Sequence, residues 1–504
     1  MESLAEQTWD AIICGTGLQQ SLLALALSRS GKQILHLDPN EYYGGNEAAL
    51  TLDEAEAWAS KTQSSEGRSV FAKASVTKSE DAAPTSSRAY ALSLSPFIVH
   101  TRSALISNLV SSRAYRQLEF LAVGTFYIFR QKPGSAEADL TPIPATREAI
   151  FATDAIQPRP KRALMKFLKF VLAHGAPESE DKWRSRANEP LARFLEEEFK
   201  LDAELRTLIL ALTLSLDGEI TVEQGLRAIE LHLTSMGVFG PGFAAIYPKY
   251  GGGSEVAQVG CRACAVGGGV YMLGTGTDST RQLEGQEDGA KHEVELSEGG
   301  IKLRTRALIR EASEVPENGT RVTRLVAVLD SPLSHLFEPV AEDTPSPGVA
   351  VIAIPPGFVK DAEGNASTHP IHAFVHSSET GECPSGQSIL YLTTPTTPSS
   401  AAALDAALSA LLALVAPADG HAPRAVWQLR YEQACPSVTA GVEAQPDTGL
   451  FTFAPAAPAL AFSDAILEPV KTVWKAVLGS EATDEVLEGY MKFEDREGIA
   501  DDDD

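Results

Sequence analysis

A pair of glycines near the start of the chain constrains its fold more than any other feature. Residues 11–14 form a short apolar run, Gly15 and Gly17 follow directly, and residues 18–30 are rich in leucine and alanine up to Gly31. A buried strand, a glycine turn and a helix that ends at a glycine are typical of the first half of a parallel βαβ unit. The sequence therefore predicts an α/β fold that begins with a dinucleotide-binding turn.

The turn matches the G-x-G-x-x-G fingerprint of dinucleotide-binding proteins at two of its three glycines. A second predicted strand, residues 33–37, ends at Asp38, in the place of the acid that holds a ribose hydroxyl in a working site. The third glycine position holds Gln20, whose long side chain would push the helix away or fill the phosphate site. We predict an FAD-type fold without a cofactor, in which a vestigial nucleotide motif consists of Gly15, Gly17 and Asp38.

Chain length and hydrophobic periodicity predict two domains. A chain of 504 residues is too long for one compact core. Apolar residues recur at helical spacing in residues 164–171 and 205–212, and strand-like patterns return further on. We expect a discontinuous α/β FAD/NAD(P)-binding domain of residues 1–145 and 241–500, with a smaller all-α domain inserted at residues 146–240.

Two segments have too few large apolar residues to contribute to a core. Residues 60–87 consist mainly of Ser, Lys, Glu, Thr and Ala, and residues 495–504 end in four aspartates. We expect both segments to be disordered, the first as a solvated insertion. The acidic tail could alternatively contact a basic partner.

Composition and charge exclude several functional classes. The formal net charge of −25 argues against nucleic acid as a partner and against attraction to an anionic membrane. The N-terminus lacks the basic and apolar regions of a signal peptide, and no apolar run approaches the length of a membrane span. Five scattered cysteines fit a reducing compartment. We expect a soluble, cytoplasmic protein.

Neither of two possible metal-ligand pairs predicts a metal site. Cys261 and Cys264 form a C-x-x-C pair, but no two further ligands follow at a sensible spacing. His372 and His376 lie in a predicted strand, where residues four apart are about 13 Å apart and cannot share one ion. We expect no metal site.

Two longer motifs identify a family. Residues 35–46, which read Leu-His-Leu-Asp-Pro-Asn-Glu-Tyr-Tyr-Gly-Gly-Asn, closely resemble the first signature block of the Rab escort protein and GDP-dissociation inhibitor superfamily. Residues 247–255 and 261–273 resemble its second block, and residues 88–96 fall at a similar spacing. Within the superfamily, the Tyr-Tyr-Gly-Gly-Asn at residues 42–46 and the Cys-Arg-x-Cys-Ala-Val after residue 260 are similar to the escort proteins.

The resemblance implies three contact regions. It implies a Rab-binding platform formed by Tyr42, Tyr43, Arg88, Glu255, Arg262 and Met272. It implies an apolar groove for the Rab C-terminal tail, for which the candidates are Leu105, Leu109, Tyr115 and Leu118. Candidates for contact with a prenyltransferase are Tyr250 and Arg262. Ordinary core packing would explain the leucines and Met272 equally well, and Tyr43 could simply fix its own loop.

The resemblance also implies a function without catalysis. An escort protein binds GDP-bound Rab GTPases, presents them to the Rab geranylgeranyltransferase heterodimer, shields the geranylgeranyl lipid and contacts membranes transiently. On this interpretation the helical domain receives the lipid. Two alternatives stay open: an inhibitor that recycles prenylated Rab, and an FAD-dependent oxidoreductase.

Overall fold

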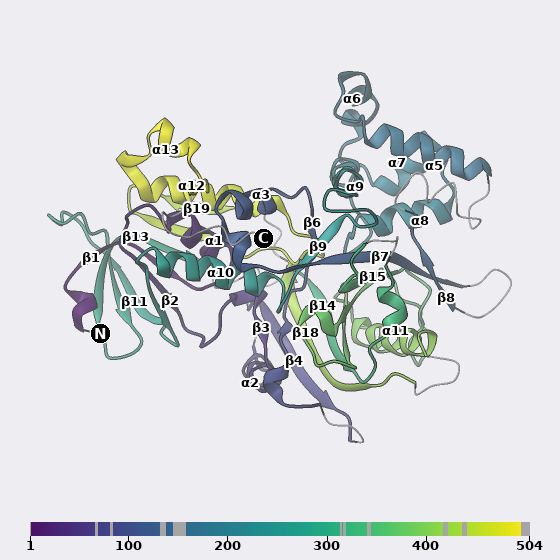
Figure 1. Ribbon diagram of the computed structural model, residues 1–504, viewed down its shortest axis with the longest axis horizontal. Coiled ribbons are helices and arrows are strands. Elements are labelled where there is room, and N and C mark those ends of the chain that lie inside the picture. Colours follow the sequence, from purple (N-terminus) through teal and green to yellow (C-terminus); the bar gives the residue numbers. More distant parts are fainter. Residues whose placement is uncertain are drawn as a thin grey trace.

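Two large β-sheets lie side by side, and a group of helices extends from the end of the second (Figure 1). The computed structural model describes residues 2–65, 69–80, 84–131, 138–144, 158–312, 315, 319–339, 344–416, 422–435 and 441–494. The tail at residues 495–504, for which we expected disorder, lies outside these ranges.

The first sheet contains the predicted glycine turn. Its main strands, in spatial order, are β10 (Val270–Leu273), β2 (Ile34–Asp38), β1 (Thr8–Cys14), β13 (Lys302–Glu311), β12 (His292–Leu296) and β11 (Thr277–Gln282). Two more, β20 (Leu450–Phe453) and β19 (Val442–Gln445), extend it beside β13. Because β1, β2, β10, β13 and β20 pair in parallel, their carboxyl ends meet at one edge of the sheet.

Helices α1 (Leu18–Leu27), α10 (Gly253–Val266) and α12 (Leu467–Leu478) cover one face of this sheet (Figure 1). Every residue of α1 is buried. Two glycines let α10 approach α1 closely: a Cβ on Gly260 would lie 2.5 Å from the Ser21 carbonyl oxygen, and one on Gly267 would lie 1.9 Å from that of Ser28. The position of α10 is therefore fixed by main-chain contact with α1.

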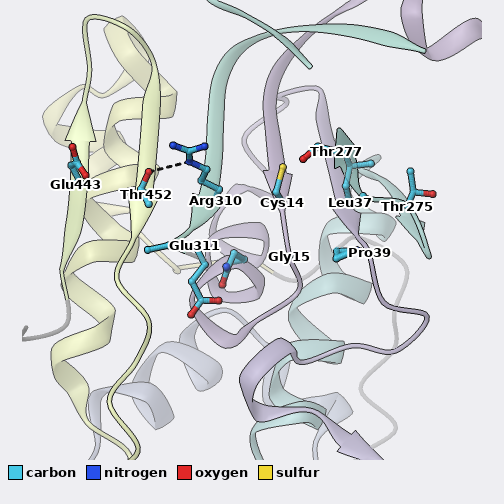
Figure 2. A pocket seen from close by; sticks show the side chains of 13 residues that line it. Cys14, Gly15, Leu37, Pro39, Thr275, Thr277, Arg310, Glu311, Glu443 and Thr452 are labelled. Atoms are coloured by element: carbon cyan, nitrogen blue, oxygen red, sulfur yellow. Dashed lines mark hydrogen bonds between the residues drawn. The ribbon is translucent and has the colours of Figure 1, made fainter. Parts of the chain in front are cut away.

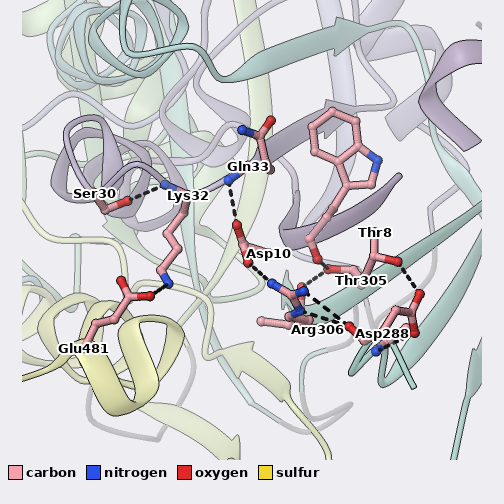
Figure 3. A network of polar contacts seen from close by, with 12 residues as sticks. Thr8, Asp10, Ser30, Lys32, Gln33, Asp288, Thr305, Arg306 and Glu481 are labelled. Atoms are coloured by element: carbon pink, nitrogen blue, oxygen red, sulfur yellow. Dashed lines mark hydrogen bonds and ion pairs between the residues drawn. The ribbon is translucent and has the colours of Figure 1, made fainter. Parts of the chain in front are cut away.

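A network of polar side chains holds the amino-terminal part of β1, at the end of the sheet opposite the glycine turn (Figure 3). Asp10 accepts hydrogen bonds from the Arg306 guanidinium at 2.5 Å and from the Gln33 main-chain nitrogen at 2.8 Å. Lys32 forms a 2.7 Å ion pair with Glu481, just before the last short helix, α13 (Asp484–Glu488). These contacts join β1, β2, β13 and the C-terminal segment.

The second sheet is mostly antiparallel. In spatial order it contains β4 (Phe71–Lys78), β18 (Ala425–Cys435), β14 (Thr320–Leu329), β17 (Ser388–Pro395), β16 (Ile371–Ser377), β15 (Val349–Ile354), β7 (Phe120–Gln131), β9 (Ala245–Pro248) and β6 (Val99–His100), with β8 (Ala138–Pro142) paired to β7. Helix α11 (Ser400–Leu414) packs on β17, and α2 (Leu52–Thr62) packs on β4. A short ladder joins β3 (Ala49–Leu50) to β5 (Leu92–Ser93).

The expectation of a disordered insertion at residues 60–87 is wrong for most of that segment. Helix α2 extends to Thr62, and β4 pairs with β18 along its length. Phe71 is buried against Trp58 and Tyr431, with ring centroids 5.3 and 5.8 Å away. Phe71, Ala72 and Ala74 are the buried side chains of β4, and they attach the strand to the core although its other residues are mostly polar. Residues 66–68 and 81–83 lie outside the described residues.

A run of helices lies between β8 and β9 (Figure 1): α5 (Pro158–Val171), α6 (Pro177–Trp183), α7 (Leu191–Phe199), α8 (Ala203–Leu212) and α9 (Val222–Ser235). Phe167, Phe170, Phe194 and Phe199 pack together at its centre. Helix α9 is capped by Thr221, whose hydroxyl accepts from the Gln224 nitrogen. The division into two domains near residues 146 and 240 stays a prediction.

Candidate functional site

A side chain of α1 fills the glycine turn between β1 and α1. Gln20 is 2% exposed, and its amide folds back over the turn. A Cβ on Gly17 would lie 2.9 Å from the Gln20 side-chain oxygen. The space that the missing third glycine would leave open is therefore taken by the amide of Gln20.

The N-terminus of α1 is capped by a carboxyl group from the chain itself. The Leu18 main-chain nitrogen, the first of the helix, donates a hydrogen bond to Glu47 at 3.3 Å. Burial, and after it the nearby Glu311, raise the pKa of Glu47 to about 8, and the Leu18 N–H opposes this shift. Burial likewise raises the pKa of Glu311 to about 7, against the effect of the Asn46 amide, which donates to it at 2.9 Å.

These carboxyl groups do not fit a dinucleotide pyrophosphate. A helix N-terminus attracts phosphate through its free N–H groups and its positive dipole end. Here Glu47 already accepts the first N–H, and Glu311 adds a second acidic group next to it. A phosphate placed there would meet two acids and the Gln20 side chain.

Asp38, the predicted ribose-binding acid, is also engaged by the chain. It is 1% exposed, and one of its oxygens accepts from the main-chain nitrogen and the hydroxyl of Thr16 at 2.7 and 2.6 Å. The other accepts from the main-chain and side-chain nitrogens of Asn40 at 2.8 and 3.0 Å. Asp38 thus joins the glycine turn to the loop that follows β2.

A pocket of about 630 Å³ remains at the carboxyl ends of these parallel strands (Figure 2). Arg310 at the end of β13 points toward Thr452 of β20, with Nε 3.4 Å from its hydroxyl. Burial raises the pKa of the Cys14 thiol, on the pocket wall, to about 12. A thiol with so high a pKa is not a nucleophile at neutral pH.

The loop that carries Tyr42 and Tyr43 lies directly on the glycine turn. The Gly44 nitrogen donates to the Thr16 hydroxyl at 3.1 Å. Gly45, with φ +51°, approaches so closely that a Cβ there would lie 3.1 Å from the Gly17 Cα. The turn therefore serves as the support of this loop.

Tyr43 lies beside α10, together with two other predicted platform residues. It is half-buried; burial raises its pKa, Cys261 adds to the shift, and Arg262 opposes it. Glu255 is half-buried on the same helix; burial raises its pKa and Arg262 opposes that shift too. We call Tyr43, Glu255 and Arg262 the α10 platform.

Arg262 extends this platform toward a neighbouring segment. It is exposed and donates at 3.5 Å to the Gln117 side chain, in the short helix Ala114–Gln117 that follows α3 (Ala104–Ser111). Tyr115, in the same short helix, is 37% exposed. Tyr115 is therefore available at the surface beside the α10 platform.

The other predicted groove residues belong to the core. Leu105 and Leu109 are 1% exposed and Leu118 is 8% exposed, packed in the same apolar cluster as α1 and α12. In this structure they do not line an open groove, because α3 turns its apolar face inward, and their contact with a Rab tail stays a prediction. Met272 is half-buried on the face of the first sheet opposite α10, so the structure does not bring it together with the platform.

Arg88 and Tyr250 lie on two adjoining surface segments. Arg88 is exposed in the short helix Ser87–Ala89, and Tyr250 is 45% exposed with a left-handed φ of +66°. Gly251, next to Tyr250, packs against Ala49. Ala49 pairs with Ser93, a few residues after Arg88, in the β3–β5 ladder, so the two segments adjoin there. Tyr42, by contrast, is half-buried against the core, and burial raises its pKa to about 12.

The two possible metal pairs are otherwise engaged. Burial raises the pKa of Cys261 to about 11 and that of Cys264 in the same direction. His376 is paired with Glu382 at 2.7 Å. Within the described ranges, no cluster of three possible metal ligands is present. In the same part of the chain, no helix combines the length and apolarity that crossing a bilayer requires.

Three acidic residues with structural roles at the site, Glu47, Glu311 and Glu382, were not predicted from the sequence. Each lies in or next to a polar loop, where an acid is ordinarily solvated. Their burial results from contacts between segments far apart in the chain. An example is the hydrogen bond from Asn46 to Glu311, which are separated by 265 residues. No local pattern could have revealed them.

Comparison with known proteins identifies relatives. A family model described as GDP dissociation inhibitor matches residues 5–355. The Saccharomyces cerevisiae protein named "Rab proteins geranylgeranyltransferase component A" is 34% identical over 408 residues, which cover 80% of this chain and 64% of that protein. The present chain therefore spans less than two thirds of that relative's length.

Solved structures agree on the fold. A Rab GDI from Plasmodium falciparum has a TM-score of 0.64 at 19% identity, covering 94% of this chain and 98% of its own. An oxidoreductase from Methanosarcina mazei has a TM-score of 0.57 at 13% identity, covering 92% of this chain and 99% of its own. At such identities the likeness concerns the fold alone, and it confirms the predicted FAD-type α/β class.

Proposed function

Because this chain belongs to the GDP dissociation inhibitor family, we propose that it is a Rab escort protein. It binds Rab GTPases in the GDP form, presents them to Rab geranylgeranyltransferase and delivers the prenylated product to membranes. It is an accessory protein rather than an enzyme, and it acts in the cytoplasm with transient membrane contact. The name of the yeast relative, a component of a Rab geranylgeranyltransferase, supports this assignment.

The observation that carries the proposal is the α10 platform. An aromatic ring, a carboxylate and a guanidinium are gathered on one side of a helix whose position is fixed by main-chain contact with α1. Tyrosine and arginine are the residue types that contribute most to protein interfaces, and a rigid helix presents them at low entropic cost. Arg88 and Tyr250 provide further contacts on the adjoining segments.

The helices α5 to α9 supply an apolar site for the lipid. Leu164 and Leu168 of α5 face Leu208 and Leu212 of α8 around a pocket that also contains Ile209, Ile229 and Leu233. Its volume is only about 10 Å³, roughly that of one water. Binding of the prenyl chain therefore requires α5 and α8 to separate.

Reconstituted prenylation tests the proposal. A purified Rab, the transferase heterodimer and geranylgeranyl diphosphate are combined with and without the purified chain. The expected result is lipid transfer to Rab only when the chain is present, with no transfer by the chain in the absence of the transferase. Failure of the chain to support transfer by an active transferase overturns the proposal.

The main alternative is an inhibitor that recycles Rab already carrying its lipid. The two functions differ in affinity: an escort protein binds unprenylated Rab and the transferase, whereas an inhibitor requires the lipid. Titration of the chain with unprenylated and prenylated forms of one Rab separates them. An FAD-dependent oxidoreductase is disfavoured by Glu47, Glu311 and Gln20 at the phosphate position, and a protein with flavin absorbance would reinstate it.

A further inference from the structure

Glu382 is a buried carboxylate with three side-chain hydrogen bonds. It is 0% exposed in the segment after β16. The Tyr247 hydroxyl donates to Oε1 at 2.6 Å, the Tyr391 hydroxyl donates to Oε2 at 2.9 Å, and His376 Nδ1 lies 2.7 Å from Oε2. These four residues come from β9, β16, β17 and the connection between the last two. A carboxylate is costly to bury, and here the full set of donors offsets that cost.

The same residues hold the segment that follows Arg88. The main-chain nitrogen of Ala91 donates to the Glu382 carbonyl oxygen at 3.1 Å. The Ser93 nitrogen donates at 3.1 Å to the Tyr391 hydroxyl, whose own proton goes to the Glu382 carboxylate. Glu382 therefore fixes this segment twice, through its main chain and through Tyr391.

The segment of Tyr250 is attached to the same point. The Tyr250 nitrogen donates to the Thr380 carbonyl oxygen at 2.8 Å, two residues before Glu382. Its ring rests on Gly381, where a Cβ would lie 2.4 Å from Cδ1. The Tyr247 hydroxyl packs directly on Gly252 at the other end of this segment. A Cβ added to Gly252 would lie only 2.6 Å from that hydroxyl.

We infer that Glu382 is a positioning residue that holds the Arg88 and Tyr250 segments in one fixed arrangement for a protein partner. The two segments are 162 residues apart in the chain, and each makes separate contacts to residues 380–382 or to a side chain bonded to Glu382. A fixed arrangement reduces the entropy lost when the partner binds. This inference rests on the proposed function, because the partner is the Rab of that proposal.

The variant Glu382→Gln changes the hydrogen bonds without removing volume. A glutamine oxygen can still accept from Tyr247, but its NH₂ group must face Tyr391 and His376. The Tyr391 oxygen already accepts from Ser93, so its O–H proton loses its acceptor. His376 Nδ1 would have to become an acceptor, which moves its proton to Nε2, a buried atom without a partner among the described residues. A buried donor left unpaired is unfavourable.

Hydrogen exchange of the main-chain amides, with Rab affinity measured on the same preparations, tests the inference. In Glu382→Gln we expect exchange at Ala91, Ser93 and Tyr250 to accelerate about tenfold or more, whereas amides of α5 to α9 stay unchanged. Affinity for GDP-bound Rab should fall about tenfold. Glu379→Gln, an exposed acid three residues away, is the matched control and should change neither quantity.

A second variant keeps the test decisive if Glu382→Gln fails to fold. Tyr391→Phe removes only the hydroxyl between Ser93 and Glu382, so exchange should accelerate at Ser93 and not at Tyr250. Unchanged exchange at Ser93 in this variant overturns the inference, and so does faster exchange in Glu382→Gln with unchanged Rab affinity. Absence of Rab binding by the unmodified chain would instead count against the proposed function, and the exchange data would still decide whether Glu382 fixes the two segments.

Discussion

The Leu18 main-chain nitrogen donates a hydrogen bond to the Glu47 carboxyl across 3.3 Å, so the helix that follows the glycine turn begins on an acid of the same chain. Glu47 belongs to the loop that carries Tyr43, and Gly45 of this loop rests on Gly17. One contact thus closes the phosphate position and holds the loop of the α10 platform.

Glu47 should make stability decrease as pH rises. Its pKa is about 8 in the folded protein and ordinary in the unfolded chain, so between these values the folded state binds the additional proton. Glu47→Gln imitates the protonated acid and can still accept the Leu18 N–H. We expect the stability advantage of the variant over the parent to grow by about 2 kcal/mol between pH 6 and pH 8 in urea denaturation.

Comparing two proteins at each pH cancels every other titrating group. The exposed Glu41, on the same loop, supplies the control variant Glu41→Gln, which should follow the parent at both pH values. An unchanged difference between Glu47→Gln and the parent from pH 6 to 8 would contradict the raised pKa.

Buried histidines should make the protein sensitive to acid. Burial lowers the pKa of His232 to about 3, and His100, whose ring lies 5.6 Å away, has its pKa lowered to about 4. The unfolded chain takes up protons near pH 6.5 while the folded protein does not, so stability is lost as pH falls from there toward 4. We expect His232→Leu to reduce the loss between pH 7 and pH 5 by about 2 kcal/mol, measured by urea denaturation.

Neither ring nitrogen of His232 has a hydrogen-bond partner in the described part of the chain, so leucine removes no bond there. The exposed His335→Gln is a control that should leave the pH dependence unchanged. The same acid sensitivity in His232→Leu as in the parent would show that the imidazole titrates normally.

Arg262→Glu should weaken Rab binding by about 10- to 100-fold, because it reverses the charge beside Glu255 at the centre of the α10 platform. Arg262 is exposed, so stability should change little. Calorimetric titration with GDP-bound Rab measures the effect, and Arg281→Glu, on the exposed strand β11, is the matched control. Equal losses of Rab affinity in both variants would indicate a general effect of charge rather than a local contact.

Tyr250→Gly should affect stability and binding in opposite directions. A non-glycine residue at φ +66° is strained, and glycine relieves about 1 kcal/mol of that strain. The ring is 45% exposed and packs on Gly381, so the loss of that contact offsets part of this gain, while the change also deletes a candidate partner contact. We expect an unchanged or higher melting temperature together with weaker assembly with Rab and the transferase, compared by gel filtration. A variant that is less stable yet assembles normally would assign the ring a structural role only.

The features that could be predicted from sequence are those set by local chemistry. The βαβ unit follows from an apolar run, two glycines and a helix rich in leucine and alanine, and the filling of the turn follows from Gln20 alone. In each case the determining residues lie within a few positions of one another.

Other features depend on contacts between distant segments. β4 is ordered because Phe71 meets Tyr431 across 360 residues, which its polar neighbours do not reveal. Leu105 and Leu109 show the same helical spacing whether they face a groove or the core, and only the packing of α3 decides. The burial of Glu47, Glu311 and Glu382 could not be predicted, because their hydrogen-bond donors come from segments that only the folded sheets bring together.

The origin of the cap on α1 has a consequence for how the protein is maintained in a cell. A fold that depends on a dissociable ligand gains stability by mass action, so its folded fraction follows the supply of that ligand. The carboxyl of Glu47 is covalently part of the chain and is always present at the helix end. The N-terminus of α1 therefore needs no flavin or nucleotide to complete its hydrogen bonding, and dialysis cannot remove its cap.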